Sequence, residues 1–189
     1  METLMARLVK SLLIVLVSAL FCSAASAETP LKPRTVRRPA FEVIGIASRT
    51  SFQKESSDSG MLPQMWKRFY KESLIDQIPS KANDEIVSCY TDFSGDATGE
   101  YTAVLGAVVK PGSKAPDGML AVQVPAGKYL EFTTEQGSLG ETVPKLWNQI
   151  TEYFKRPGAP KRTFKTDYEV YEAAIDPAHA SGKIYVGVK

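Results

Sequence analysis

One glutamate is a chemical candidate because it lies among aromatic residues in a stretch with the alternating pattern of a β-strand. In "DYEVY", residues 167–171, Glu169 and Tyr171 share one side, while Tyr168 and Val170 share the other. A carboxylate in this setting has three interpretations. It is a solvated acid on a strand, a counter-ion for an apolar cation held against the rings, or a general base whose pKa is raised by apolar surroundings.

Similar segments recur within the chain at an offset of 81 residues. Trp66 in "PQMWKRFYKES" corresponds to Trp147 in "PKLWNQITEYF", and Tyr90 corresponds to Tyr171. Two further pairs at this offset are Cys89 with Val170 and Gly106 with Gly187. Several matches at one offset indicate a duplicated unit.

The elements expected around these residues follow the same order twice. The first half has a strand pattern over 41–50, a helical apolar stripe over 62–70, and strand patterns over 85–93 and 100–109. The second half has a strand region over 118–137 that breaks near 125–127, a helical stripe over 139–154, and strand patterns over 163–174 and 183–189. Ser138 and Glu141 have the spacing of a capping box. Pro144 predicts that this helix begins near Thr142 or has an irregular first turn.

This order predicts an α+β fold made of a duplicated β-α-β-β unit. Repeat one spans about 40–110 and repeat two about 118–189. We expect a curved antiparallel sheet with both helices on one face and a central ligand cleft on the other.

The two faces of the sheet should carry different residues. The offset matches Cys89 with Val170, and we expect both to lie under the helices, where Cys89 acts as a small buried apolar residue. The open face would then carry Tyr90 and Tyr171 as a symmetric pair. It would also carry Glu169, whose equivalent at the same offset is only Ser88.

The first 39 residues are expected to lie outside the fold. Two basic residues precede an apolar run over 11–22, and "ASA" at 25–27 suits cleavage, so residues 1–27 are interpreted as a secretory signal peptide. The apolar run is shorter than the roughly 20 residues of a membrane-spanning helix. Residues 28–39, "ETPLKPRTVRRP", are interpreted as a basic, proline-rich tether. The mature chain is therefore expected to be periplasmic or secreted, with Cys89 as a lone thiol.

Composition and single residues argue against several other functions. The net charge of +2 gives little attraction to nucleic acid. His179 is the only histidine, so neither a zinc site of the usual ligands nor a Ser-His-Asp triad is expected. There is no P-loop and no dinucleotide-binding glycine motif. We therefore expect no metal and no cofactor.

An ordered set of segments resembles a known family. "FEVIGIASRT", "MWKRF", "YTDFSGDATGEYTAVLGAVV", "VPAGKYLEF", "LWNQITEYF" and "DYEVYE" follow one another as in the gyrase-inhibitor-like (GyrI-like) effector-binding domains of AraC- and MerR-type transcription activators. The similarity covers residues 40–189. It implies the duplicated β-α-β-β fold and a cleft that binds amphipathic, often cationic compounds around a glutamate, here Glu169. The aromatic wall that it implies comprises Tyr90, Trp66, Tyr129, Trp147, Tyr171 and Tyr185. Trp66 and Trp147 also lie on the apolar stripes of the two helices, so each is equally a candidate for the core.

The chain departs from this family in its surroundings. Residues 28–39 are too few for a DNA-binding domain, and export would remove the route to a promoter, so no nucleic-acid partner is expected. The leading hypothesis is an exported protein that captures a small amphipathic cation. The alternatives are a hydrolase of electrophilic compounds that uses Glu169 with Tyr171 or Tyr90, and a module that binds another protein.

Overall fold

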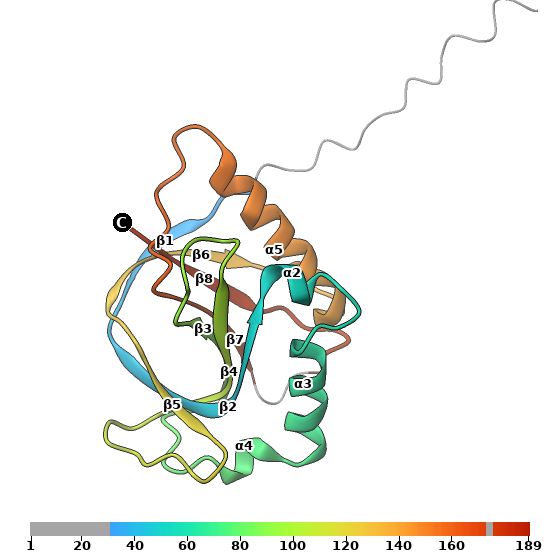
Figure 1. Cartoon of the computed structure of the whole chain (residues 1–189), viewed down its shortest axis with the longest axis vertical. Helices are drawn as coiled ribbons and strands as arrows, with labels where there is room; N and C mark the ends of the chain where they lie inside the picture. The colour runs from blue at the N-terminus through green and yellow to red at the C-terminus, as the bar shows by residue number, and fades with distance from the viewer. Residues whose placement is uncertain (1–30, 173–175) are drawn as a thin grey trace, which may run out of the picture. The chain divides into compact units, whose positions relative to one another are not determined.

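The computed structural model of the protein describes residues 31–172 and 176–189 (Figure 1). The predicted signal peptide lies outside these residues. The elements are β1 (Arg34–Arg38), β2 (Phe41–Ser51), α2 (Phe52–Glu55), α3 (Leu62–Lys71), α4 (Leu74–Gln77), β3 (Glu85–Thr91), β4 (Glu100–Val109), β5 (Leu120–Val124), β6 (Gly127–Thr133), α5 (Leu139–Lys155), β7 (Thr166–Glu172) and β8 (Lys183–Val188). Among them, no helix has the length and hydropathy needed to cross a bilayer.

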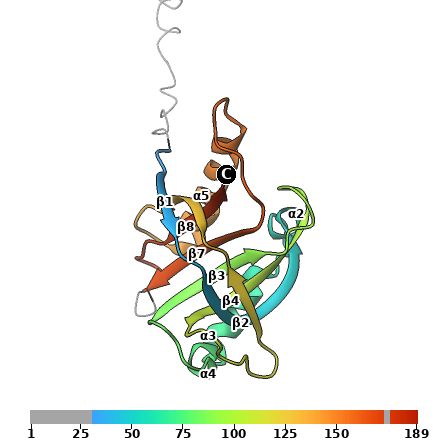
Figure 2. The same cartoon turned by 90° about the vertical axis from the view of Figure 1, so that its left-hand side faces the viewer.

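The strands of the described residues form one curved sheet in the order β1-β6-β8-β7-β3-β4-β2-β5, and every pairing is antiparallel. The sheet curls like a half-barrel, with α3 and α5 along one side (Figure 1) and β1 at one edge (Figure 2). The order has a centre of symmetry between β7 and β3. The predicted curved antiparallel sheet is therefore confirmed, whereas the duplication stays a prediction.

The two longer helices begin and end close to the predicted stripes. Met65 and Phe69 of α3 are buried in one core cluster, and Leu146 and Ile150 of α5 are buried in another. Pro144 lies inside α5, which nevertheless begins at Leu139. The predicted capping box is wrong, because the Ser138 side chain makes no cap hydrogen bond.

The basic segment before the predicted domain is part of the sheet. Residues 34–38, which the composition assigns to a tether, form β1 and pair with β6. Arg34 forms a salt bridge with Glu131 at 2.9 Å, and Arg38 Nε donates a hydrogen bond to the hydroxyl of Tyr168 at 3.2 Å. The tether interpretation is wrong for these residues because their partners are distant in sequence and invisible to local composition.

The predicted division of residues between the two faces is correct, but the face that the helices cover was assigned the wrong way round. Tyr90 and Tyr171 belong to the same core cluster as Phe69 of α3, so they lie under a helix and not on an open face. Cys89 lies on the opposite side, in a cluster with Tyr168. Burial raises the pKa of the Cys89 thiol to about 12, which keeps it in the unreactive protonated form.

Candidate functional site

Strand β7 places Glu169 in the middle of the sheet. Its paired neighbours are Ser88 on β3 and Ile184 on β8, and it is only 2% exposed. The alternation of β7 directs Glu169 to the helix-covered side together with Tyr171. The carboxylate therefore lies between the sheet and the helices, where water has little access.

Both oxygens of this carboxylate accept hydrogen bonds from aromatic side chains. Trp147 Nε1, from α5, donates to Oε1 at 2.5 Å, and the hydroxyl of Tyr171 donates to Oε2 at 2.7 Å. Ser88 Oγ donates to the hydroxyl of Tyr90 at 3.1 Å. That bond leaves the Tyr90 proton free to point at Glu169, whose pKa it lowers. Each of these donors is neutral.

Burial has the largest effect on the protonation of Glu169. Desolvation raises the pKa of its carboxyl above the ordinary value, and the hydrogen bonds from Trp147, Tyr171 and Tyr90 oppose this rise. Among the residues that the structure describes, no lysine or arginine contributes to the pKa of Glu169. The same burial raises the pKa of the hydroxyls of Tyr90 and Tyr171, which therefore remain neutral donors. The site holds one buried acidic group without a cationic partner.

Aromatic rings enclose this group from both helices. On the α3 side, Trp66 meets Tyr171 edge to face at 5.4 Å between ring centroids. On the α5 side, Trp147 meets Tyr90 edge to face at 5.7 Å. Both tryptophans are half-buried, so each serves the core and also borders the site. Four of the six aromatic residues that the family resemblance implies are therefore brought together around Glu169.

The other two lie elsewhere. Tyr129 and Tyr185 are on the opposite side of the sheet, where Tyr168 contacts both rings, at 5.4 and 4.6 Å. Arg38 of β1 also lies over the Tyr185 ring, at 5.1 Å. Their assignment to the site is wrong, because both residues alternate away from the helix-covered side.

Sequence reasoning also missed Tyr101. It lies at the start of β4 and meets Tyr90 edge to face at 5.5 Å. Burial raises the pKa of the Tyr101 hydroxyl, and the charges of Glu55 and Glu169 add smaller increases. The sequence offered only the alternation of β4, which puts Tyr101 on the same side as Ala103. That Ala103 pairs with Tyr90 is seen only in the structure.

The described residues contain no cluster of histidine, cysteine and carboxylate side chains that could hold a metal ion. His179 pairs with Asp176 at 2.9 Å on the surface, three residues away in the chain. The chemistry of the site therefore rests on Glu169 and the neutral groups around it.

Comparisons with known proteins agree with this architecture. Residues 34–188 match the family described as "Cass2: Integron-associated effector binding protein". The chain is 28% identical over 147 residues to YobU of Bacillus subtilis, which is named as a transcriptional regulator; the match covers 77% of this chain and 90% of YobU. It is 35% identical over 100 residues to the transcriptional regulator BrlR of Pseudomonas aeruginosa, covering 53% of this chain but only 34% of BrlR.

Two solved structures share the fold. The integron cassette protein VCH_CASS2 from the mobile metagenome of Vibrio cholerae has a TM-score of 0.66 at 22% identity, covering 83% of this chain and 95% of that one. The structure of SAV2435 bound to tetraphenylphosphonium has a TM-score of 0.69 at 15% identity, covering 84% and 94%. Fold and family match together confirm the predicted GyrI-like effector-binding domain, and the chain belongs to the family of integron-associated effector binding proteins.

Proposed function

We propose that this protein binds a small amphipathic organic cation and that Glu169 is its counter-ion. The observation that carries the proposal is the buried carboxylate, 2% exposed and without a lysine or arginine partner among the described residues. Burying an unpaired charge costs several kcal/mol. A bound cation offsets that cost, and each ring face adds about 0.5–2 kcal/mol of cation–π attraction.

A cation that binds Glu169 must compete with Trp147 for the carboxylate. Its indole donates to Oε1 of Glu169, so a cation that approaches this oxygen displaces the indole N–H. Trp147 lies three residues after Pro144, whose missing N–H removes one hydrogen bond from the first part of α5. A movement of the Trp147 side chain is therefore expected to accompany binding.

Titration with tetraphenylphosphonium tests the proposal, because a protein of the same fold has been solved with this cation. Saturable binding that quenches tryptophan fluorescence is expected, and a neutral molecule of the same shape, tetraphenylmethane or a more soluble analogue, should bind much more weakly. Equal affinity for the neutral and the charged molecule would contradict a counter-ion role.

We favour binding over hydrolysis. A general base must hold a water molecule against one carboxylate oxygen, and at Glu169 that water would have to share or displace a side-chain donor on either oxygen. Multiple turnovers of an electrophilic ester or epoxide, lost in Glu169→Gln, would reverse this preference.

The proposal includes export of the protein and a function that does not involve nucleic acid. The apolar run over 11–22 and the "ASA" at 25–27 support secretion with cleavage near Ala27. The low net charge supports a function without nucleic acid. N-terminal sequencing of protein recovered from the periplasm tests the first point, and a DNA gel-shift assay tests the second.

The symmetric strand order supports a common origin for the two halves. In this view β2-α3-β3-β4 and β6-α5-β7-β8 descend from one repeated unit. The ligand lies between α3 of the first copy and α5 of the second. The halves differ at the paired positions Ser88 and Glu169.

A further inference from the structure

A row of half-buried aromatic side chains leads away from Glu169 toward the surface. From Tyr90, which contacts Trp147, the row continues to Tyr101 at 5.5 Å and to Phe93 at 5.5 Å. It then reaches Phe164 at 5.8 Å. Tyr101, Phe93 and Phe164 are all half-buried, whereas Tyr90 is buried. We call these three residues the aromatic row.

The row lies at the end of the sheet where β3 ends and β7 begins. Phe93 follows β3, Tyr101 is near the start of β4, and Phe164 precedes β7. The loop between β3 and β4 runs beside α2 (Figures 1 and 2), and Lys54 of α2 pairs with Glu100 at 3.3 Å. The row therefore belongs to the rim of the candidate site on the side of α2 and α5.

Phe164 adopts a backbone conformation that its side chain disfavours. Its φ of 49° lies in the left-handed region, which costs an L-residue with a bulky side chain about 1–2 kcal/mol relative to glycine. The ring is held by the Arg162 guanidinium, 4.5 Å from its centroid, on one side and by Phe93 on another. Strain kept at a half-buried aromatic residue points to a use for that ring.

The charges near the row favour a ligand with a cationic end. The charges of Glu55 and Glu169 both raise the pKa of the Tyr101 hydroxyl, so both carboxylates lie within electrostatic range of it. Glu55 accepts hydrogen bonds from the backbone N–H groups of Met61 and Leu62 and thereby stays in place at the start of α3. Arg162, whose guanidinium lies over the Phe164 ring, is paired with the buried Asp167.

We propose that the aromatic row binds the flat apolar end of the ligand whose cationic end lies against Glu169. The inference rests on the proposed function and makes it more specific: the ligand class is an elongated cation with an extended aromatic tail, in preference to a compact cation. The contact between Tyr90 and Tyr101 places the aromatic row next to a ring that borders Glu169.

Two probes with the same cationic head separate this inference from the proposed function. Benzyltrimethylammonium carries one ring, and biphenylmethyl-trimethylammonium carries two in line. Because the second ring buries further apolar area, we expect wild type to bind the longer probe about 10-fold or more tightly than the shorter one. Both affinities are measured by calorimetry at the same pH and ionic strength.

Phe164→Gly removes one ring of the row and relieves the strained φ, so the relief of strain offsets part of the lost ring contacts and the variant should still fold. We expect the preference for the longer probe to fall by about 3-fold or more, while the affinity for the shorter probe is unchanged. Phe52→Ala removes an exposed aromatic ring outside the row, 42% exposed on α2, and should leave both affinities as they are. Tyr101→Leu, which keeps apolar volume, tests the fall in preference for the longer probe if Phe164→Gly fails to fold.

The outcomes are distinguishable. Equal binding of the two probes by wild type, or an unchanged preference in Phe164→Gly and Tyr101→Leu, overturns the inference and leaves the proposed function standing. Failure of wild type to bind either probe counts against the proposed function and removes the inference with it.

Discussion

Replacing Glu169 by glutamine removes the charge of the candidate site and keeps its shape. The amide oxygen still accepts from Trp147 Nε1, and the amide nitrogen donates to the hydroxyl of Tyr171, which can accept as well as donate. Burial raises the pKa of Glu169, so its ionisation opposes folding in full above that raised pKa, and the opposition shrinks as the pH falls from there toward the pKa of the unfolded chain. The variant should therefore be at least as stable as wild type at neutral pH.

The effect on binding is much larger than the effect on stability. A monovalent cation about 4–6 Å from the carboxylate, at an effective dielectric constant of about 20, is attracted by roughly 3–4 kcal/mol. Loss of this attraction corresponds to a drop in affinity of about 100- to 1000-fold. The hydrogen-bonded rings remain, so apolar contacts should be retained.

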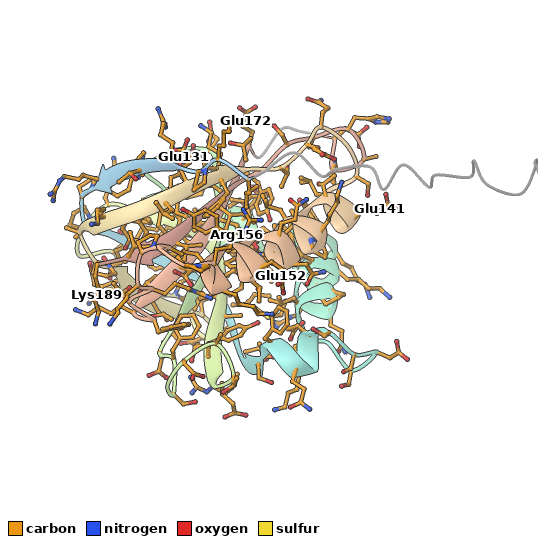
Figure 3. All side chains as sticks on the ribbon, turned by 90° about the horizontal axis from the view of Figure 1, so that it is seen from above. Glu131, Glu141, Glu152, Arg156, Glu172 and Lys189 are labelled. Carbon is orange, nitrogen blue, oxygen red and sulfur yellow. The ribbon has the colours of Figure 1, made fainter. Side chains whose placement is uncertain are left out.

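Isothermal titration with tetraphenylphosphonium measures this drop. Glu172→Gln is the matched control, because it makes the same change on the same strand at an exposed position, where Figure 3 labels it. The control should bind like wild type. If Glu169→Gln is folded and binds the cation within about threefold of wild type, the counter-ion argument is refuted.

Three other outcomes follow from the same geometry. Because burial raises the pKa of Glu169, lowering the pH through that pKa should weaken cation binding. Binding near that pH should also release a proton, which calorimetry in buffers of different ionisation enthalpy detects. Trp147→Phe removes a donor to the charged carboxylate and should lower the free energy of unfolding by about 1.5–3 kcal/mol at neutral pH, and by less in acid, as measured by urea denaturation. Arg162→Leu leaves Asp167 buried without its cation and should cost about 3–5 kcal/mol; a loss below 1 kcal/mol would show that the pair is not needed.

The alternation of β-strands predicts which residues share a side but not which side the helices cover. Glu169, Tyr171 and Tyr90 were grouped correctly from their spacing, and the structure brings them together. The opposite side is equally apolar, because the curled sheet buries Cys89 and Tyr168 there as well. With no contrast in polarity between the two sides, the sequence contained no signal for choosing between them.

The position of Trp147 shows a second limit. Its place on the apolar stripe of α5 predicts a core residue, and its half-buried ring does pack against the core. The hydrogen bond from Nε1 to Glu169 depends on how α5 lies across β7, which no local pattern encodes. Strand β1 shows the same limit, since its pairing with β6 requires contacts between residues about 97 positions apart.

The central pair of strands explains why the site has one carboxylate and not two. Ser88 and Glu169 are directly paired on β3 and β7, close to the centre of symmetry of the sheet. Two carboxylates at such paired positions would repel each other, and one would take up a proton. A serine avoids this repulsion, and its hydrogen bond to Tyr90 turns a further neutral donor toward Glu169. Under the proposed function, the site thus holds a single negative charge at little repulsive cost and matches a ligand with a single positive charge.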